Sequence, residues 1–425
     1  MRLPIELIDG ILDYLSDDPV SLSNCSVSSY AFTSTSQRKL FASVKITPPR
    51  CHDHASLTRK LYQTLKESPR LSAYVHTLQL EDVGQIVTCK NGVTHHWLAL
   101  DEDFPLLLTT LPAVRKLIWN NGLNWFNWFA LPCTTRQAIQ TAFVQWPLAH
   151  LEVMGMVNFP LSSIKTTKPL RHVELRAVHF VEEIRPGSSD DCSAMVKPLL
   201  EGCTPKLKSL SLVEPCRRLL PELATWFAED MDVSGLQSLS FKTYGGYYPK
   251  GEDVVSMLRI LQASASSITT LEVSPALEGT DITTIPSLAL PPLEYPNLHA
   301  LSLGFEVSDL PLYTGDASGN SSAQWVARSL ENLANSPSQS LKTIQLRCHL
   351  VQADPAATFD QDIWKSLAKH MCSPKLGQLR EVEIQIHAVY SEAKAAMPAV
   401  SNLLRDVMLK PFGERGISLQ IEEIS

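Results

Sequence analysis

One short apolar motif recurs along most of the chain. It has an apolar residue, two residues of any kind, a second apolar residue, one residue of any kind and a third apolar residue. The copies are spaced about 34 residues apart on average, and the intervals range from 22 to 43 residues. The end of each copy alternates with period two, which predicts a short strand with one buried face. The copies start at Val75, Val114, Leu148, Leu170, Leu207, Leu236, Ile268, Leu298, Leu341 and Leu379, and Ile417, Leu419 and Ile421 are expected to form a final strand.

Helical segments are expected between the copies of the motif. Residues 134–144, 253–263, 322–333, 361–371 and 391–409 are examples. A repeat of one strand and one helix buries its apolar residues only against neighbouring repeats, so residues 71–425 are expected to form one α/β domain.

This alternation resembles the leucine-rich-repeat (LRR) solenoid, in which parallel strands line the concave face and helices the convex face. The Asn or Cys that usually follows the strand in that family is mostly missing, so we describe the tract as LRR-like. The alternative is a doubly wound sheet with several domains. No Gly-x-Gly-x-x-Gly or Gly-x-x-x-x-Gly-Lys phosphate loop follows any expected strand, which argues against it.

The N-terminal domain is expected to span residues 1–46, with three short helices in its first 41 residues. Pro4 suits a first helical turn, and Glu6 favours a helix N-terminus. Asp18 can cap a second helix that begins at Pro19. Three helices of this length lie near the lower size limit for a self-sufficient core, which points to packing against a partner or the rest of the chain. A helix over 55–67 then lies in a linker, residues 47–70.

The same segment resembles an F-box of the fungal type. The resemblance rests on Leu3, Pro4, Glu6, Leu7 and Ile8, on the Asp17-Asp18-Pro19 turn, and on Leu22, Cys25, Ser26, Phe32, Leu40 and Phe41. It implies docking to a Skp adaptor and, through it, to a cullin–RING ubiquitin ligase. The adaptor-facing positions that it implies are Leu3, Pro4, Leu7, Ile8, Ile11, Leu15, Leu22, Cys25, Phe32 and Leu40.

Two residues depart from the F-box pattern. Ser28 stands where an aliphatic residue is usual, and Tyr30 stands where a basic residue is common. A Ser28 hydroxyl buried in the adaptor interface without a hydrogen-bond partner would cost about 1–3 kcal/mol. The two departures therefore bear on the affinity for the Skp adaptor. The alternative is an ordinary helical cap on a repeat domain.

Composition narrows the range of functions. Hydrophobic residues make up 44% of the chain and charged residues 19%, as in globular proteins. The net charge of −7 argues against nucleic acid as the partner. The N-terminus lacks the pattern of a signal peptide, and no apolar stretch is long enough to cross a bilayer. We therefore expect a soluble cytoplasmic or nuclear protein whose nine cysteines, which have irregular spacing, are reduced.

The most unusual segment is 119–129, with five aromatic residues in eleven. Trp119, Trp125, Phe126 and Trp128 are candidates for substrate contact, because Trp is favoured at interfaces. The alternative is that these rings fill the space under a long insertion. Tyr247, between two expected repeats, is a further candidate with a simple turn as its alternative.

Nothing in the sequence predicts a cofactor or a metal site. Cys51, His52 and His54, and the pair His95 and His96, lack a second pair at zinc spacing. We expect a non-catalytic, substrate-binding subunit of a ubiquitin ligase. A protein-binding scaffold without a ligase role, and a hydrolase on an open α/β sheet, are the alternatives.

Overall fold

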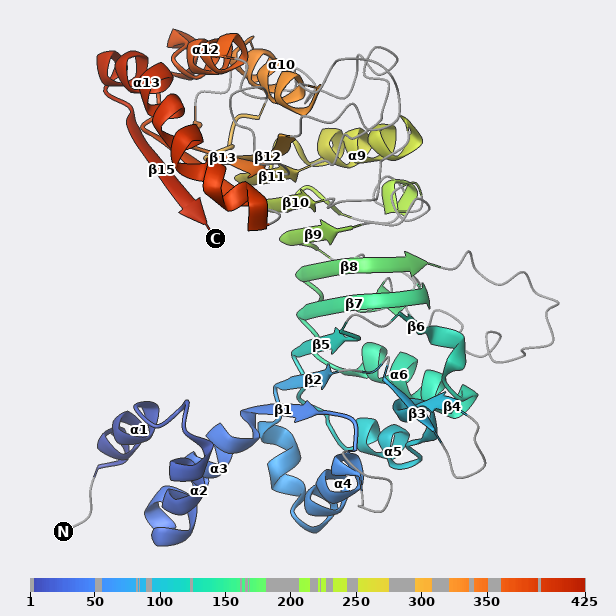
Figure 1. Cartoon of the computed structure of the whole chain (residues 1–425). Helices are drawn as coiled ribbons and strands as arrows, with labels where there is room; N and C mark the ends of the chain where they lie inside the picture. Colours follow the sequence, from blue (N-terminus) through green and yellow to red (C-terminus); the bar gives the residue numbers. More distant parts are fainter. Residues whose placement is uncertain are drawn as a thin grey trace, which may run out of the picture. The chain divides into compact units, whose positions relative to one another are not determined.

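The computed structural model has an α/β fold with parallel strands (Figure 1). It divides into an N-terminal unit, Met1–Pro205, and a C-terminal unit, Lys206–Ser425. It describes residues 4–49, 56–81, 83, 85–88, 94–122, 125–160, 163–164, 167, 169–180, 206–214, 221, 223–226, 232–242, 251–274, 295–307, 321–335, 340–350, 361–388 and 391–424.

The N-terminal unit begins with three helices, as predicted: α1 (Ile5–Asp13), α2 (Pro19–Ser28) and α3 (Tyr30–Ala42). Asp18 caps α2, because its carboxylate accepts hydrogen bonds from the N–H groups of Val20 and Ser21, both at 3.1 Å. Ser29 caps α3 through the N–H of Ala31. Extended backbone at Ser29 separates α2 from α3 and turns the chain between them.

Five parallel strands follow in the N-terminal unit, in the order β1 (Ser43–Ile46), β2 (Thr77–Glu81), β5 (Lys116–Asn120), β7 (His150–Phe159) and β8 (His172–Phe180). The helices are α4 (Leu57–Glu67), α5 (Asp103–Thr109) and α6 (Cys133–Gln145). The 3₁₀ turns are η1 (Pro69–Tyr74), η2 (Trp97–Leu100) and η3 (Trp128–Ala130). Strand β6 (Phe126–Asn127) pairs with β7, and β3 (Ile86–Thr88) and β4 (Thr94–His96) form a hairpin.

The C-terminal unit has seven parallel strands in chain order: β9 (Ser209–Val213), β10 (Ser238–Lys242), β11 (Thr270–Ser274), β12 (Ala300–Val307), β13 (Thr343–Leu350), β14 (Glu381–Ala388) and β15 (Ser418–Ile424). Its helices are α9 (Gly251–Ser264), α10 (Ser321–Asn335), α12 (Gln361–Met371) and α13 (Met397–Arg415), with 3₁₀ turns η5 (Pro374–Leu376) and η6 (Ser391–Ala396).

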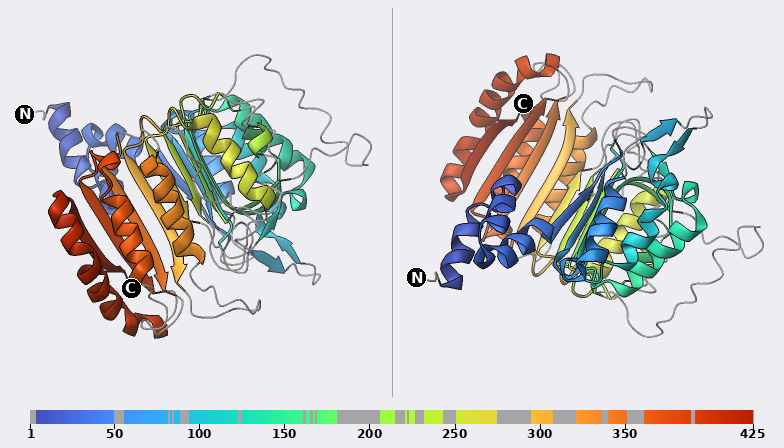
Figure 2. Two further views of the ribbon diagram at one scale, coloured as in Figure 1. Left: turned by 90° about the horizontal axis from the view of Figure 1, so that it is seen from above. Right: turned by 90° about the horizontal axis from the view of Figure 1, so that it is seen from below.

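Every copy of the apolar motif coincides with a strand, and the final strand also forms, as predicted. The motif residues occupy matching registers: Leu78 pairs with Leu117, and Leu117 with Leu151. In the C-terminal unit Leu301 pairs with Ile344, and Ile344 with Val382. These side chains are buried, and the helices that follow β1 lie over one face of the strands within each unit (Figure 2). The strand order never reverses within either unit, whereas a doubly wound sheet requires a reversal.

The three-helix segment joins the sheet without a spacer. Helix α3 ends at Ala42 and β1 begins at Ser43, so residues 43–46 form the first strand of the sheet. The carbonyl of Ala42 accepts a hydrogen bond from the N–H of His76 at 3.0 Å. The Arg70 guanidinium donates to the Gln37 side chain at 3.1 Å. These contacts tie the C-terminal half of α3 to the segment that precedes β2.

Candidate functional site

Helices α1–α3 pack around a small apolar core of their own. Ile8, Leu12 and Leu22 are at most 3% exposed. The row of α1 that holds Ile8 and Leu12 faces α2 and α3, which leaves the neighbouring row of Leu7 and Ile11 on the outside. Ile8 and Leu22 are therefore core residues, which corrects the expectation that they face a partner. Of the other predicted adaptor-facing residues, Leu15, Cys25, Phe32 and Leu40 are partly buried against this core, Pro4 is exposed, and Leu3 lies outside the described residues.

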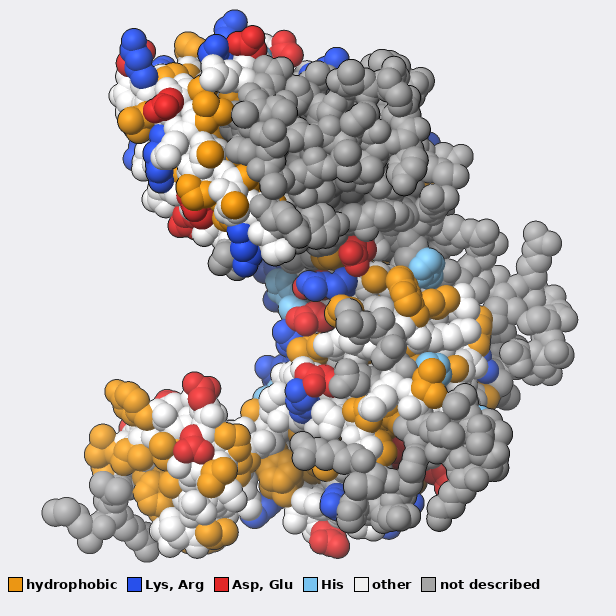
Figure 3. All heavy atoms as spheres, viewed as in Figure 1, with side chains coloured by type: hydrophobic (Ala, Val, Ile, Leu, Met, Phe, Trp, Pro, Cys, Tyr) orange, Lys and Arg blue, Asp and Glu red, His pale blue; other side chains and the backbone are white. Residues whose placement is uncertain are grey.

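Large apolar side chains are exposed around this core. Leu7 is 55% exposed, Ile11 46% and Tyr14 93%. Hydrophobic atoms gather over α1–α3 in the space-filling view (Figure 3). Half of the strongly exposed large hydrophobic residues in the described part of the chain lie here, within its first 30 positions. We call them the exposed apolar set: Ile5, Leu7, Ile11, Tyr14, Val20, Val27 and Tyr30.

The two departures from the F-box pattern are both on the surface. The Ser28 hydroxyl donates to the carbonyl of Cys25 at 3.0 Å, so its proton already has an acceptor. Tyr30 is 95% exposed at the start of α3. Neither side chain disturbs the core of the three-helix segment.

Most of the aromatic segment is interior. Trp119, Phe126 and Trp128 are at most 3% exposed, and their rings contact one another at centroid distances of 6.3 Å. Burial rules these three out as direct contacts for a substrate, which corrects that expectation. Trp125 is 51% exposed, and its ring packs edge-on against His179. Tyr247 lies outside the described residues.

A buried asparagine, which sequence reasoning did not propose as a site residue, holds this aromatic cluster in place. Asn121 is fully buried, accepts a hydrogen bond from the Trp119 indole N–H at 3.1 Å, and donates to the carbonyl of Gly155 at 2.8 Å. Gly155 has a φ of 68°, which favours glycine. Asn121 thus links the end of β5 to β7.

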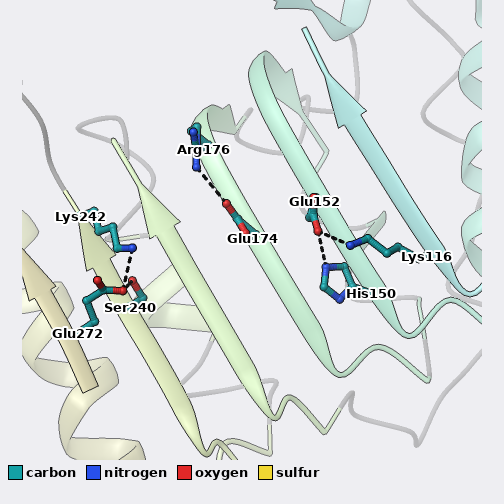
Figure 4. Close-up of polar contacts among 8 residues, drawn as sticks. All are labelled: Lys116, His150, Glu152, Glu174, Arg176, Ser240, Lys242 and Glu272. Atoms are coloured by element: carbon teal, nitrogen blue, oxygen red, sulfur yellow. Dashed lines mark hydrogen bonds and ion pairs between the residues drawn. The ribbon is translucent and has the colours of Figure 1, made fainter. Parts of the chain in front are cut away.

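On the face of the sheet opposite the motif residues, the N-terminal unit carries interacting polar side chains (Figure 4). Glu152 on β7 accepts from Lys116 on β5 and contacts the His150 ring, both at 2.7 Å. Burial raises the pKa of Glu152, but hydrogen bonds from Lys116 and His150 outweigh it, so the pKa falls below its ordinary value. Glu174 and Arg176 pair along β8 at 3.4 Å.

The C-terminal unit has a denser polar network on the equivalent face. Glu272 on β11 accepts from Ser240 at 2.8 Å and Lys242 at 2.9 Å, both on β10, and from Arg347 on β13. Burial raises the pKa of Glu272, but the hydrogen bonds from Lys242 and Ser240 and the charge of Arg347 lower it overall. Farther along, Glu383 accepts from the amide groups of Gln345 and Gln385 at 2.7 and 2.6 Å.

A stacked histidine pair adjoins this network. The rings of His349 on β13 and His387 on β14 lie 5.0 Å apart at an interplanar angle of 22°. Burial lowers the pKa of His349 to about 4, with further contributions from His387 and Arg347. His349 is therefore neutral at physiological pH.

The described cysteines and histidines bear on whether the protein has a nucleophilic or metal-binding site. Burial raises the pKa of the Cys348 thiol to about 12, which makes it a poor nucleophile. Cys25, Cys348 and Cys372 are free, whereas Cys133 is disulfide-bonded, which corrects the expectation of reduced thiols throughout. His96 packs edge-on against Phe126. Within the described ranges no cluster of three or more His, Cys, Asp or Glu could hold a metal ion; Cys51, His52 and His54 lie outside them.

No protein-family model matches the sequence, and no curated protein matches it significantly. None of the helices in the described part of the chain combines the length and the hydropathy needed to span a bilayer.

Proposed function

We propose that the protein is a non-catalytic substrate-recognition subunit of a Skp–cullin–F-box ubiquitin ligase. In this proposal α1–α3 dock to the Skp adaptor, and the sheet, an LRR-like solenoid, binds a target protein. Holding the target near the ubiquitin-charged enzyme raises the local concentration of its lysines, which is how a subunit without catalytic residues promotes transfer.

The exposed apolar set carries the proposal. Leu7, Ile11 and Tyr14 expose apolar surface on a segment whose own core is only three buried residues, and such exposed groups mark interaction sites. Helix α1 follows directly on Pro4, and α2 begins at Pro19 behind its Asp18 cap. Ion pairs from Asp9 to Arg38 and from Asp13 to Lys39 join α1 to α3.

The target-binding part of the proposal is supported by the strand order and by the polar face. Parallel strands in chain order, with helices on one face, are the arrangement of LRR solenoids. The opposite face presents charged and amide side chains in register. Binding residues are often positioned in this way on a rigid scaffold.

Adaptor binding is tested by co-purification of the full chain with a Skp adaptor. We expect the double variant Leu7→Asp with Ile11→Asp to lose the adaptor while keeping its melting temperature, because both side chains are exposed. Leu409→Asp is the matched control, since Leu409 is 62% exposed on α13 and lies outside the proposed interface. An intact protein that fails to retain the adaptor would exclude the ligase role and leave the scaffold as the better explanation.

A further inference from the structure

Two arginines lie in one row where the strands of the N-terminal unit begin. Arg115 precedes β5, Arg171 precedes β8, and Ala149 precedes β7 between them. The N–H of Ala149 donates to the carbonyl of Arg115 at 2.8 Å, and the N–H of Arg171 donates to the carbonyl of Ala149 at 2.9 Å. Adjacent strands lie about 4.8 Å apart, so the two arginine backbones are about 10 Å apart, with only a methyl group between them.

A second row of nitrogen-bearing side chains lies directly inside the first. Lys116, His150 and His172 are register partners on β5, β7 and β8. The two imidazole rings stack at 5.6 Å. Glu152 is the carboxylate that Lys116 and His150 share, so the charge of Lys116 is balanced within the row. We call the side chains of Arg115, Lys116, His150, Arg171 and His172 the basic rim.

The arginines of the basic rim are available to a ligand. Both are exposed, and neither has an ion-pair partner within the described part of the chain. The space-filling view shows Lys, Arg and His atoms where β5, β7 and β8 begin (Figure 3). Local positive charge is unexpected in a protein with a net charge of −7.

Basic residues at this position could instead complement the C-terminal ends of helices. The C-terminal unit provides the comparison, because His299, Lys342 and Arg380 occupy the same kind of row, joined by equivalent backbone hydrogen bonds. Its second row is different: Ala300, Thr343 and Glu381, with no basic group. Interaction with helix ends would explain the basic residues that precede the strands in both units. It would not explain why only the N-terminal unit has a second basic row, Lys116, His150 and His172.

We propose that the basic rim binds an acidic segment of a protein partner, with two oxyanions of that segment paired to Arg115 and Arg171. A polyproline-II segment has three residues per turn and rises about 3.1 Å per residue, so carboxylates or phosphates three residues apart project from the same side, at roughly the separation of the two arginines. Guanidinium groups pair with either oxyanion in bidentate fashion. The rim covers three strands, which is short for nucleic acid, since such sites neutralise about 6–10 phosphates. The inference rests on the proposed function only in treating the sheet as the target-binding part.

Fluorescence anisotropy with the purified full chain tests the inference without any adaptor. The probe is a fluorescein-labelled Gly/Ser peptide with two glutamates three residues apart, alongside versions with phosphoserine or glutamine at both positions. We expect the acidic peptides to bind and the glutamine peptide not to bind. The tighter of the two acidic peptides identifies the oxyanion as carboxylate or phosphate.

Two double variants each remove two positive charges from residues that precede strands. Arg115→Ala with Arg171→Ala should weaken binding at least tenfold, whereas Lys342→Ala with Arg380→Ala should change it less than twofold. Equal losses from both variants, or no binding of either acidic peptide, would overturn the proposal. Displacement of the probe by a single-stranded oligonucleotide at a lower concentration than by unlabelled peptide would also overturn it, in favour of nucleic acid. None of these results bears on adaptor docking by α1–α3, so the two proposals can fail separately.

Discussion

Arg347 on β13 donates a hydrogen bond to Glu272 on β11, across the full width of the intervening strand β12. The residue of β12 in register with Arg347 is Gly304. Gly304 carries no side chain on this face, and the side chain of Ser274 on β11 lies over it. Among the ion pairs of the described residues in the C-terminal unit, this one joins the partners that are farthest apart in sequence.

The first prediction concerns this ion pair. Arg347→Met should lower the free energy of unfolding by about 1.5–3 kcal/mol, because it removes a hydrogen bond to a charged group. Glu272→Gln should be coupled to it in a double-mutant cycle followed by urea denaturation. Lys365→Met is the control: its ion pair with Asp362 is exposed and is expected to contribute less than about 1 kcal/mol. Strict additivity of the two substitutions would contradict a direct interaction.

The pH dependence of Glu272 has a definite sign. Its folded pKa lies below the ordinary value of 4.5, so its contribution is fully present above that value and is lost as the pH falls through the folded pKa. The stability difference between wild type and Glu272→Gln should therefore shrink below pH 4.5. A difference that stays constant down to the acid-unfolding range would contradict the assignment.

The third prediction concerns Gly304. A Cβ at this position would lie 2.5 Å from the Cβ of Ser274 and 3.3 Å from its Cα. Gly304→Ala should therefore destabilise the C-terminal unit by about 1–3 kcal/mol through overpacking. Adding Ser274→Gly should restore part of that loss, because it removes the atom that clashes. Thermal unfolding of the single and double variants measures both effects, and a double variant less stable than the sum of its parts would refute the account.

The fourth prediction concerns His349, whose folded pKa of about 4 lies below the ordinary 6.5. The unfolded chain binds more protons than the folded chain in that window, so stability is present above pH 6.5 and falls as the pH drops towards 4. The loss attributable to this group is on the order of 3 kcal/mol. His349→Gln should flatten the stability profile measured by urea denaturation over this range. His387→Gln should raise the pKa of His349, because the charge of His387 helps to lower it.

The fifth prediction separates the two tryptophans that the sequence treats alike. Trp128→Ala should cost about 3–5 kcal/mol of stability, as expected for a buried ring. Trp125→Ala should cost less than about 1 kcal/mol, because this ring is half exposed. The melting temperatures of the two variants measure these stability losses. Similar losses for both would mean that Trp125 belongs to the same core as Trp128.

The strands were predictable because their signal is local. Leu271 and Val273 alternate with polar residues within one strand, and the same pattern recurs at each repeat. The helix after Ala55 and the cap at Asp18 follow equally short-range rules. These features need no knowledge of which other segments lie nearby.

The arrangement of side chains on the faces was not predictable in the same way. Leu7 and Ile8 are adjacent and equally apolar, and only the placement of α2 and α3 makes one exposed and the other core. Glu272 and Arg347 are 75 residues apart in sequence, and their pairing follows from strand order. Phe126 lies on β6, which pairs with β7, and a two-residue strand does not reveal this pairing in advance.

Because α3 passes directly into β1, the number of residues at this junction sets how the three helices are rotated relative to the sheet. An α-helix turns about 100° for each residue, so one residue inserted between Ala42 and Ser43 would swing the outward row of α1 a quarter-turn or more around the sheet. Transplanting the three helices onto another repeat domain therefore requires matching the phase of the helix, and not merely joining two folded pieces.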